Sequence, residues 1–269
     1  MLRRVALVLC FAQAAGFSMP SGLTTKSFEH PKWSPLQAHL DELPAFTCTN
    51  QDGEPLGFEQ NGKEVSVFFM DVDVAEAQLA GWREQYPELN LRLLGVGLGE
   101  ALKRSIQGEA VIFPSQAAIE AAGEEWNPEE VPLYACLVMS KESRDGSGGM
   151  VTPFFCDPLD ARENLAQAYE KIQKELGELD EDQKNALSLV VTSLPKAVEL
   201  VLEGKEKETC GDDRFEFIPP SRSVAYLQSA AEELEKRKGE RRAAAVQDAA
   251  PKPPDSGTPG GGGGGLFPE

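Results

Sequence analysis

The sequence predicts an α+β fold in which one supersecondary unit is used twice. The sequence LPAFTC at residues 43–48 returns as VPLYAC at residues 131–136. The sequence FFMD at residues 68–71 returns in the same order as FFCD at residues 154–157. Tandem self-similarity on this scale is typical of a repeated structural unit. A residue that recurs in both copies is therefore expected to build the unit rather than to carry out chemistry.

Turn residues and hydrophobic spacing predict the elements of the first unit, residues 43–123. A strand at 43–49 and a returning strand at 65–70 flank the hairpin-type dipeptide Asp52-Gly53. The next helix has an apolar face with spacings of four, three and four residues, and Pro87 stops it. The remaining elements follow in the order helix, strand, helix, strand, helix, at residues 74–86, 91–96, 98–106, 110–113 and after Ser115, which is a suitable helix cap.

The second unit, residues 131–231, repeats this β-hairpin/α/β/α/β/α order. Its apolar helix faces fall in register with those of the first unit, which indicates that each face fits an equivalent sheet surface. Together the units predict a mixed sheet flanked by helices. The matched faces are Ala75, Leu79, Trp82 and Tyr86 with Ala161, Leu165, Ala168 and Ile172, and Leu98, Ala101, Leu102 and Ile106 with Leu194, Ala197, Val198 and Leu202.

Both ends of the chain have compositions unlike the middle. Residues 1–16 have a basic start, a short apolar run and small residues, as in a secretory signal peptide, with cleavage expected between Gly16 and Phe17. Residues 17–40 begin with a hydroxyl-rich stretch free of acidic residues, as in a plastid transit peptide, and together the two segments favour a bipartite plastid presequence over plain secretion. Residues 243–269 are rich in Ala, Pro and Gly and are expected to be disordered.

Charge and histidine content argue against several classes of function. The chain has 269 residues, a formal net charge of -18 and a pI of about 4.6, so it is expected to repel nucleic acids and anionic lipid. Its only histidines, His30 and His39, precede the repeated region, which leaves that region without the commonest general base and metal ligand. We therefore expect a protein that is not an enzyme and has no metal, cofactor or nucleic-acid partner.

The cysteines are expected to be structural. The sequence has no C-x-x-C pair, which disfavours zinc and thioredoxin-type redox sites. Cys48 and Cys136 occupy equivalent positions on predicted strands and are interpreted as small buried hydrophobes. In an oxidising compartment, Cys48–Cys136 and Cys156–Cys210 remain alternative disulfide pairs.

The alternative enzymatic interpretation depends on Asp71 and Asp73. An apolar strand ending in Asp-x-Asp resembles the first motif of haloacid-dehalogenase-type magnesium phosphatases, with a nucleophilic first aspartate and an acid/base second one. Lys196 and Asp212 would be their partners. The second unit, however, keeps Asp157 at the position of Asp71 and has Leu159 at the position of Asp73. A recurring aspartate directly before a helix is better explained as a helix cap.

Aromatic side chains in both units are the candidates for an apolar client-binding surface. Neighbouring residues of a strand point to opposite faces of the sheet, so one member of each Phe-Phe pair is expected in the core. The other lies under a helix or in an exposed groove, and burial is the default expectation. The candidates are Phe46, Phe68, Phe69, Tyr134, Phe154 and Phe155.

These motifs, in this doubled order, resemble the Tic22 family, the 22 kDa component of the translocon at the inner chloroplast envelope. The resemblance covers about residues 43–231 and includes the segment from Leu43 to Leu56, with the sequence LPAFTCTNQDGEPL. It also includes VFFMD at 67–71, VPLY at 131–134 and PFF at 153–155. The acidic stretches at 123–130 and 175–182 and the glycine tail depart from the family pattern.

The resemblance implies a duplicated α+β fold with pseudo-twofold symmetry. It also implies a soluble factor, at most peripheral to membranes, that assists preprotein import by chaperone-like contact with transit peptides. Its partners would be preproteins and other subunits of the plastid translocon. The expected location is the plastid, in the envelope intermembrane space or an adjacent compartment of a complex plastid. No catalytic residues are implied.

Overall fold

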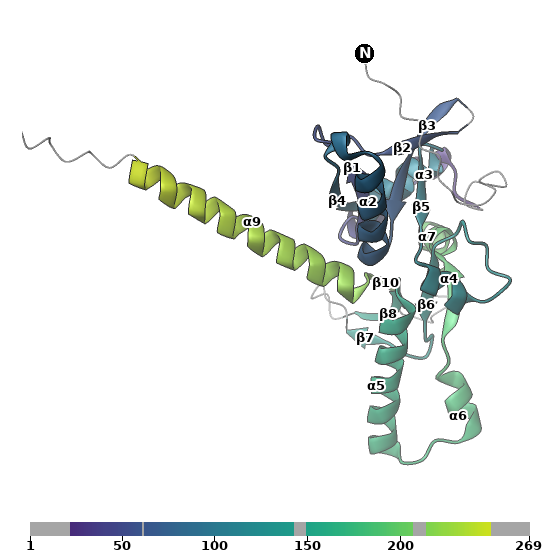
Figure 1. The fold of residues 1–269 in the computed structure, drawn as a ribbon. Coiled ribbons are helices and arrows are strands. Elements are labelled where there is room, and N and C mark those ends of the chain that lie inside the picture. The colour runs from purple at the N-terminus through teal and green to yellow at the C-terminus, as the bar shows by residue number, and fades with distance from the viewer. Residues whose placement is uncertain (1–21, 61, 143–148, 207–213, 249–269) are drawn as a thin grey trace, which may run out of the picture. The chain divides into compact units, whose positions relative to one another are not determined.

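The computed structural model describes residues 22–60, 62–142, 149–206 and 214–248 (Figure 1). The chain divides into two compact units, Met1–Leu227 and Gln228–Glu269. The first unit holds two five-stranded sheets and the helices that cover them. The predicted α+β class is confirmed.

The first sheet contains β1 to β5, and β3 is its hub. One edge of β3 pairs with the short strand β2 and then with β1, where Phe46 faces Phe69. The other edge pairs with β5, in parallel. β4 pairs with β1 along its length. The strands are β1 (Pro44–Thr49), β2 (Gly57–Gln60), β3 (Lys63–Phe69), β4 (Arg92–Gly97) and β5 (Ala110–Phe113).

The second sheet has the same pairing order around β8. β8 pairs with β7 and β6 in antiparallel fashion and with β10 in parallel, and β6 pairs with β9. The equal pairing orders agree with the elements expected for a repeated unit, while the duplication itself stays a prediction. The strands are β6 (Pro132–Ala135), β7 (Lys141–Glu142), β8 (Met150–Phe155), β9 (Val190–Ser193) and β10 (Arg214–Ile218).

Helices follow the strands at the expected places. Pro87 lies just past α2, as predicted for a residue that cannot continue a helix. The helices of the first half are η1 (Thr25–Glu29), α1 (Trp33–Leu40), α2 (Val72–Gln85), η2 (Pro87–Leu89), α3 (Leu98–Ile106) and α4 (Gln116–Ala122). Those of the second half are α5 (Pro158–Leu176), α6 (Glu181–Ala186), α7 (Leu194–Glu203) and α9 (Ser221–Asp248).

A shared core joins the two halves. Phe68 of β3 and Phe154 of β8 both belong to this cluster, together with residues of α1, α3 and α7. The adjacent Phe69 and Phe155 point to the opposite faces and join two separate outer clusters. The predicted division of each Phe-Phe pair between two faces is therefore confirmed, as the alternation of a strand requires.

The last helices of the two halves are exchanged between the sheets. α4 follows β5 of the first sheet, but its Ala118 packs in the cluster that contains Tyr134 of the second sheet. α9 follows β10 of the second sheet, but its Tyr226 meets Phe46 of the first sheet with ring centroids 5.8 Å apart. Each sheet is therefore covered in part by a helix of the other half.

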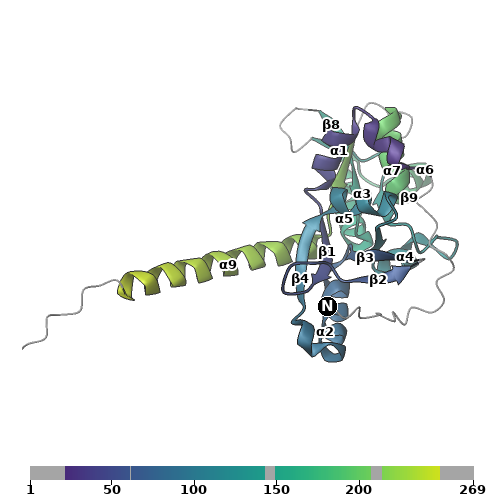
Figure 2. The ribbon, with the colours of Figure 1, turned by 90° about the horizontal axis from the view of Figure 1, so that it is seen from above.

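The segment before β1 is part of the folded unit. Leu23, Trp33, Leu36 and Leu40 are buried in the shared core, and α1 contacts both α3 and α7 (Figure 2). A presequence that extended to residue 40 would remove these side chains from the core. Processing of residues 17–40 as a whole stays a prediction, but the burial favours any removed segment ending before Leu23.

Two sequence expectations change in detail. The strand at 91–96, whose apolar run is typical of a buried strand, is the edge strand β4, and Leu94 on it is 43% exposed. The final helix continues to Asp248, past the expected start of disorder at residue 243, since Ala243–Ala245 are strong helix formers. Residues 249–269 lie outside the described part.

Candidate functional site

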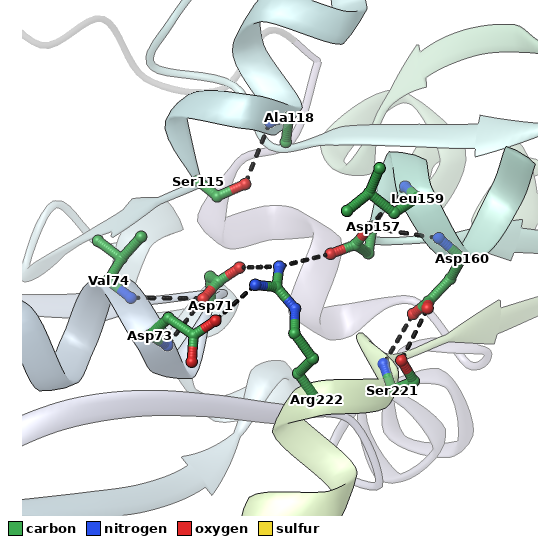
Figure 3. Close-up of polar contacts among 10 residues, drawn as sticks. All are labelled: Asp71, Asp73, Val74, Ser115, Ala118, Asp157, Leu159, Asp160, Ser221 and Arg222. Atoms are coloured by element: carbon green, nitrogen blue, oxygen red, sulfur yellow. Dashed lines mark hydrogen bonds and ion pairs between the residues drawn. The ribbon is translucent and has the colours of Figure 1, made fainter.

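Arg222 joins the two halves at the first turn of α9 (Figure 3). Its Nη2 donates to Asp71 Oδ2 at 2.9 Å and to Asp157 Oδ2 at 3.0 Å. Its Nη1 donates to Asp73. Asp71 precedes α2 in the first half, and Asp157 precedes α5 in the second. One guanidinium therefore pairs with the equivalent aspartates of both halves.

Each of these two aspartates divides its oxygens between its own helix and Arg222. Asp71 Oδ1 accepts from the backbone N–H of Asp73 at 2.8 Å and of Val74 at 3.3 Å. Asp157 Oδ1 accepts in the same way from Leu159 at 2.6 Å and Asp160 at 3.3 Å. Both carboxylates are N-caps, and both are 5% exposed. The recurring aspartate is a helix cap, as the comparison of the two copies predicted.

A second contact fixes the start of α9. The backbone N–H and the Oγ of Ser221 donate to the two carboxylate oxygens of Asp160, each at 2.7 Å (Figure 3). Ser115, at the position equivalent to Ser221, instead caps α4 by accepting from Ala118 N–H at 3.1 Å. The predicted Ser115 cap is confirmed. The start of α9 thus has contacts with both α2 and α5.

The electrostatics keep Arg222 charged. Partial burial lowers the pKa of Arg222, but the hydrogen bond to Asp157 and the charges of Asp71, Asp157 and Asp73 outweigh it, so the pKa is raised. The Arg222 side chain is 46% exposed and the Asp73 side chain 59% exposed, whereas Asp71 and Asp157 are buried. The arrangement pairs two buried negative charges with one half-exposed positive charge.

This geometry does not support the phosphatase interpretation. A nucleophilic aspartate needs a free oxygen aimed at the substrate, whereas both oxygens of Asp71 are already used by α2 and Arg222. Lys196 pairs with Glu199 of its own helix at 2.6 Å, and Asp212 lies outside the described residues. Within the described part of the chain, no group of three or more His, Cys, Asp and Glu is arranged to hold a metal ion.

Arg222 was not among the residues that the sequence predicted, because no local sequence pattern indicates its role. The position equivalent to Arg222 in the first half is Gln116, which contacts Glu120 of its own helix. Because only one copy has the arginine, the repeat gives no signal for it. Its partners lie 65 and 151 residues away along the chain.

The six aromatic candidates for a client-binding surface are buried in the core, so they do not form an exposed surface in this structure. Phe68 and Phe154 lie in the shared core, and the others lie in the two outer clusters beneath helices. They are buried because each faces either the other half or a covering helix. Their exposed fractions are 0% for Phe46, 2% for Phe68, 2% for Phe69, 1% for Tyr134, 1% for Phe154 and 9% for Phe155.

A small hollow, too tight to hold a water molecule, lies beside α5. We call this place the α5 pocket. Leu165 of α5 and Leu189 before β9 are half-buried there, in contrast to the fully buried Leu79 of α2. Phe155 closes its inner side. The pocket is lined by Cys136, Met139, Pro153, Phe155, Ala161, Asn164, Leu165 and Leu189.

Cys48, Cys136 and Cys156 are buried, and no disulfide joins Cys48 to Cys136 in this structure. Burial raises the pKa of Cys48 and of Cys156 to about 12 in each case. Their interpretation as buried hydrophobes agrees with this. The alternative partner Cys210 and the expected cleavage position at Gly16 and Phe17 lie outside the described residues.

No described helix combines the length and apolar character needed to cross a bilayer. This finding concerns only residues in the described ranges.

The fold and its Arg222 junction define a two-sheet α+β protein whose halves are joined by a shared core and an ion-pair cluster. Comparison with solved structures shows that the fold of this chain is Tic22-like. Tic22 from Plasmodium falciparum is similar with a TM-score of 0.56 at 19% identity, over 74% of this chain and 98% of that one. Tic22 from Anabaena, described as a protein of protein transport, has a TM-score of 0.52 at 17% identity, over 73% and 96%.

No protein-family model matches the chain, and no curated protein matches it either. At the identities of the two solved structures, the likeness establishes the fold.

Proposed function

We propose that the protein assists the import of precursor proteins into a plastid by chaperone-like contact with them. The observation that carries this proposal is the likeness of nearly the whole length of two Tic22 structures to this chain. One of them is described as a protein of protein transport. The expected location is the intermembrane space of the envelope, or an adjacent compartment of a complex plastid. Other translocon subunits are the expected further partners.

The α5 pocket is the proposed contact for an unfolded client. An extended chain segment exposes apolar side chains, and half-buried Leu165 and Leu189 can bury more surface without any change in the core. The six aromatic residues expected for this role are buried and would need the fold to open.

The net charge of the chain supports weak attraction of transit peptides. A formal charge of -18 attracts basic, acid-poor segments over a distance of about 8–10 Å at physiological salt. Charge steering would bring the peptide near, and the apolar pocket would hold it at short range. Both contributions are expected to be modest, as a factor that releases its client requires.

The test is the aggregation of a chemically unfolded client enzyme, followed by light scattering with and without the purified protein. Wild type is expected to delay aggregation. Leu189→Gln, in the α5 pocket, is expected to weaken this delay by a few-fold. Leu94→Gln is the matched control, because Leu94 is an exposed leucine of the first sheet, outside the pocket.

Three outcomes would contradict the proposal or its details. If wild type neither delays aggregation nor binds a fluorescent transit peptide, the proposed function is wrong. If Leu189→Gln and Leu94→Gln shorten the delay of aggregation equally, the α5 pocket is not the client contact. If crosslinking in isolated plastids captures translocon subunits but no precursor, a purely structural subunit is the better description.

A further inference from the structure

The chain is anchored to the second half of the fold almost from its first described residue. We call residues 22–41, which include η1 and α1, the N-terminal strap. Leu23 of the strap is 2% exposed and lies in the shared core with residues of α1, α3 and α7. A chain that lost Leu23 would leave a cavity in this core.

Gly22, directly before this anchor, lies against a carboxylate of α7. Its φ of 98° is in the left-handed region that favours glycine. A Cβ at this position would lie only 2.7 Å from Oε1 of Glu199, so the carboxylate packs against the Gly22 Cα. The backbone nitrogen of Gly22 is bonded to the same Cα, which puts it within about 5 Å of that oxygen.

The two oxygens of Glu199 have different surroundings. Lys196 of the same helix donates to Oε2 at 2.6 Å, and its side chain is 54% exposed. This bond leaves Oε1, the oxygen nearest Gly22, for another donor. The Glu199 side chain is only 23% exposed, so a cation placed at Oε1 would be less screened by water than one at the open surface.

The strap already brings one cation to the end of α7. Lys32 donates to the backbone carbonyl of Val201 at 2.9 Å, and its Nζ lies 3.9 Å from a carboxylate oxygen of Glu206. A cation is favourable there because the last carbonyl groups of a helix carry partial negative charge. A second cation at Gly22 would hold the beginning of the strap in the same way.

We propose that processing of the presequence ends with a cut directly before Gly22, and that the new α-ammonium group pairs with Glu199. Hydrolysis of the peptide bond between residues 21 and 22 by a peptidase consumes one water molecule. It leaves a carboxylate on the released segment and an amine on Gly22. A free α-amine is protonated at neutral pH, whereas the amide N–H of the uncut chain has no charge. The cut therefore creates an ion-pair partner for Glu199.

The neighbouring bonds are less suitable for this cut. A chain that began at Leu23 would carry its charged terminus on a residue that is buried in the core. A chain that began before Gly22 would keep an uncharged amide beside Glu199. The proposed cut divides the transit-peptide-like segment 17–40: residues 17–21 are removed, and residues 22–40 stay as part of the fold.

The first test is mass spectrometry of the N-terminal peptide of the protein purified from its own cells. The expected first residue is Gly22. Any other first residue overturns the assigned cut, including Phe17, which removal of the signal peptide alone would leave.

The second test measures the ion pair in two purified forms of the chain, one beginning at Gly22 and one at Phe17. The pKa of the α-amine is followed by NMR after ¹³C-methylation. In the form beginning at Gly22 it is expected above the ordinary value of about 8, because a carboxylate within about 5 Å favours the charged amine. Glu199→Gln should return the pKa to that ordinary value. Glu203→Gln, one turn further along α7, is the matched control and should leave it raised.

Stability gives a second readout of the same pair. At neutral pH, the unfolding equilibrium constant of the form beginning at Gly22 should rise about two- to fivefold with Glu199→Gln, and that of the form beginning at Phe17 should change less. Because the pKa is raised on folding, this advantage is complete below the unfolded pKa and is lost as the pH rises past the folded one.

Two results would overturn the ion pair. One is an α-amine pKa that is the same in both forms, and the other is a raised pKa that Glu199→Gln leaves unchanged. Neither test involves a client protein, so a failure here leaves the proposed import function untouched.

Discussion

The outer faces of the two sheets have equivalent strands but different cover. Beneath α2, nine buried residues form the outer cluster of the first sheet, including Leu79 and Trp82. Beneath α5, the described residues of the outer cluster include five buried ones. At the positions equivalent to Leu79 and Trp82, α5 has Leu165 and Ala168, which are half-buried.

The comparison shows that the same arrangement of strands can be covered closely by one helix and less closely by another. A large indole fills the space under α2, whereas α5 has only a methyl group at the equivalent position. The face under α2 is closely packed, whereas Leu165 and Ala168 of α5 stay half-buried. Close packing stabilises a fold, and surface left open is available for binding.

The largest effect is expected from the same substitution at equivalent positions. Leu79→Ala should lower the free energy of unfolding by about 3 kcal/mol, because it leaves a cavity in a closely packed cluster. Leu165→Ala should lower it by about 1 kcal/mol, because the side chain is only half-buried. Urea unfolding of both variants measures the difference. Equal losses would mean that the two faces are packed alike.

A smaller effect is expected at the junction between the halves. Arg222→Gln removes the partner of two buried carboxylates, and half-exposure of the arginine should limit the loss of unfolding free energy to about 1–2 kcal/mol. Gln116→Ala, at the equivalent position of α4, is the control and should change it by less than about 0.5 kcal/mol. An unfolding transition unaffected by Arg222→Gln would show that the ion pairs contribute nothing.

The smallest effect concerns the equivalent cysteines Cys48 and Cys136. Burial raises the pKa of both, to about 12 for Cys48, and Cys136 also lines the α5 pocket. In a chain with serine at positions 10 and 210, Cys136 should react with a thiol reagent before Cys48, with mass spectrometry identifying the labelled site. Faster labelling of Cys48 would contradict the difference in packing.

The buried thiols of Cys48 and Cys156 predict a loss of stability in alkali. An unfolded cysteine ionises near 9.0, whereas folded Cys48 and Cys156 ionise at about 12. A raised folded pKa means that the contribution of the neutral thiol is complete below pH 9 and is lost as the pH rises toward 12. Unfolding free energies measured across this range should fall accordingly.

Much of the fold was predictable because its signals are local. The alternation of strand residues separates Phe68 from Phe69, and the four-three spacing of Ala75, Leu79 and Trp82 gives the buried face of α2. The cap at Asp71 was predictable because the backbone N–H groups that donate to its carboxylate are two and three residues away. The aromatic candidates for client binding are buried in the structure. The sequence indicates which face of a strand carries a side chain but not what covers that face.

The amino-acid sequence by itself determined the order of strands and helices and the capping aspartates, since each depends on residues a few positions apart. Only the tertiary structure decided the exchange of α4 and α9 between the sheets, the shared guanidinium of Arg222 and the pocket beside α5. These features join segments tens of residues apart, and contacts over such separations leave no periodic trace in the chain.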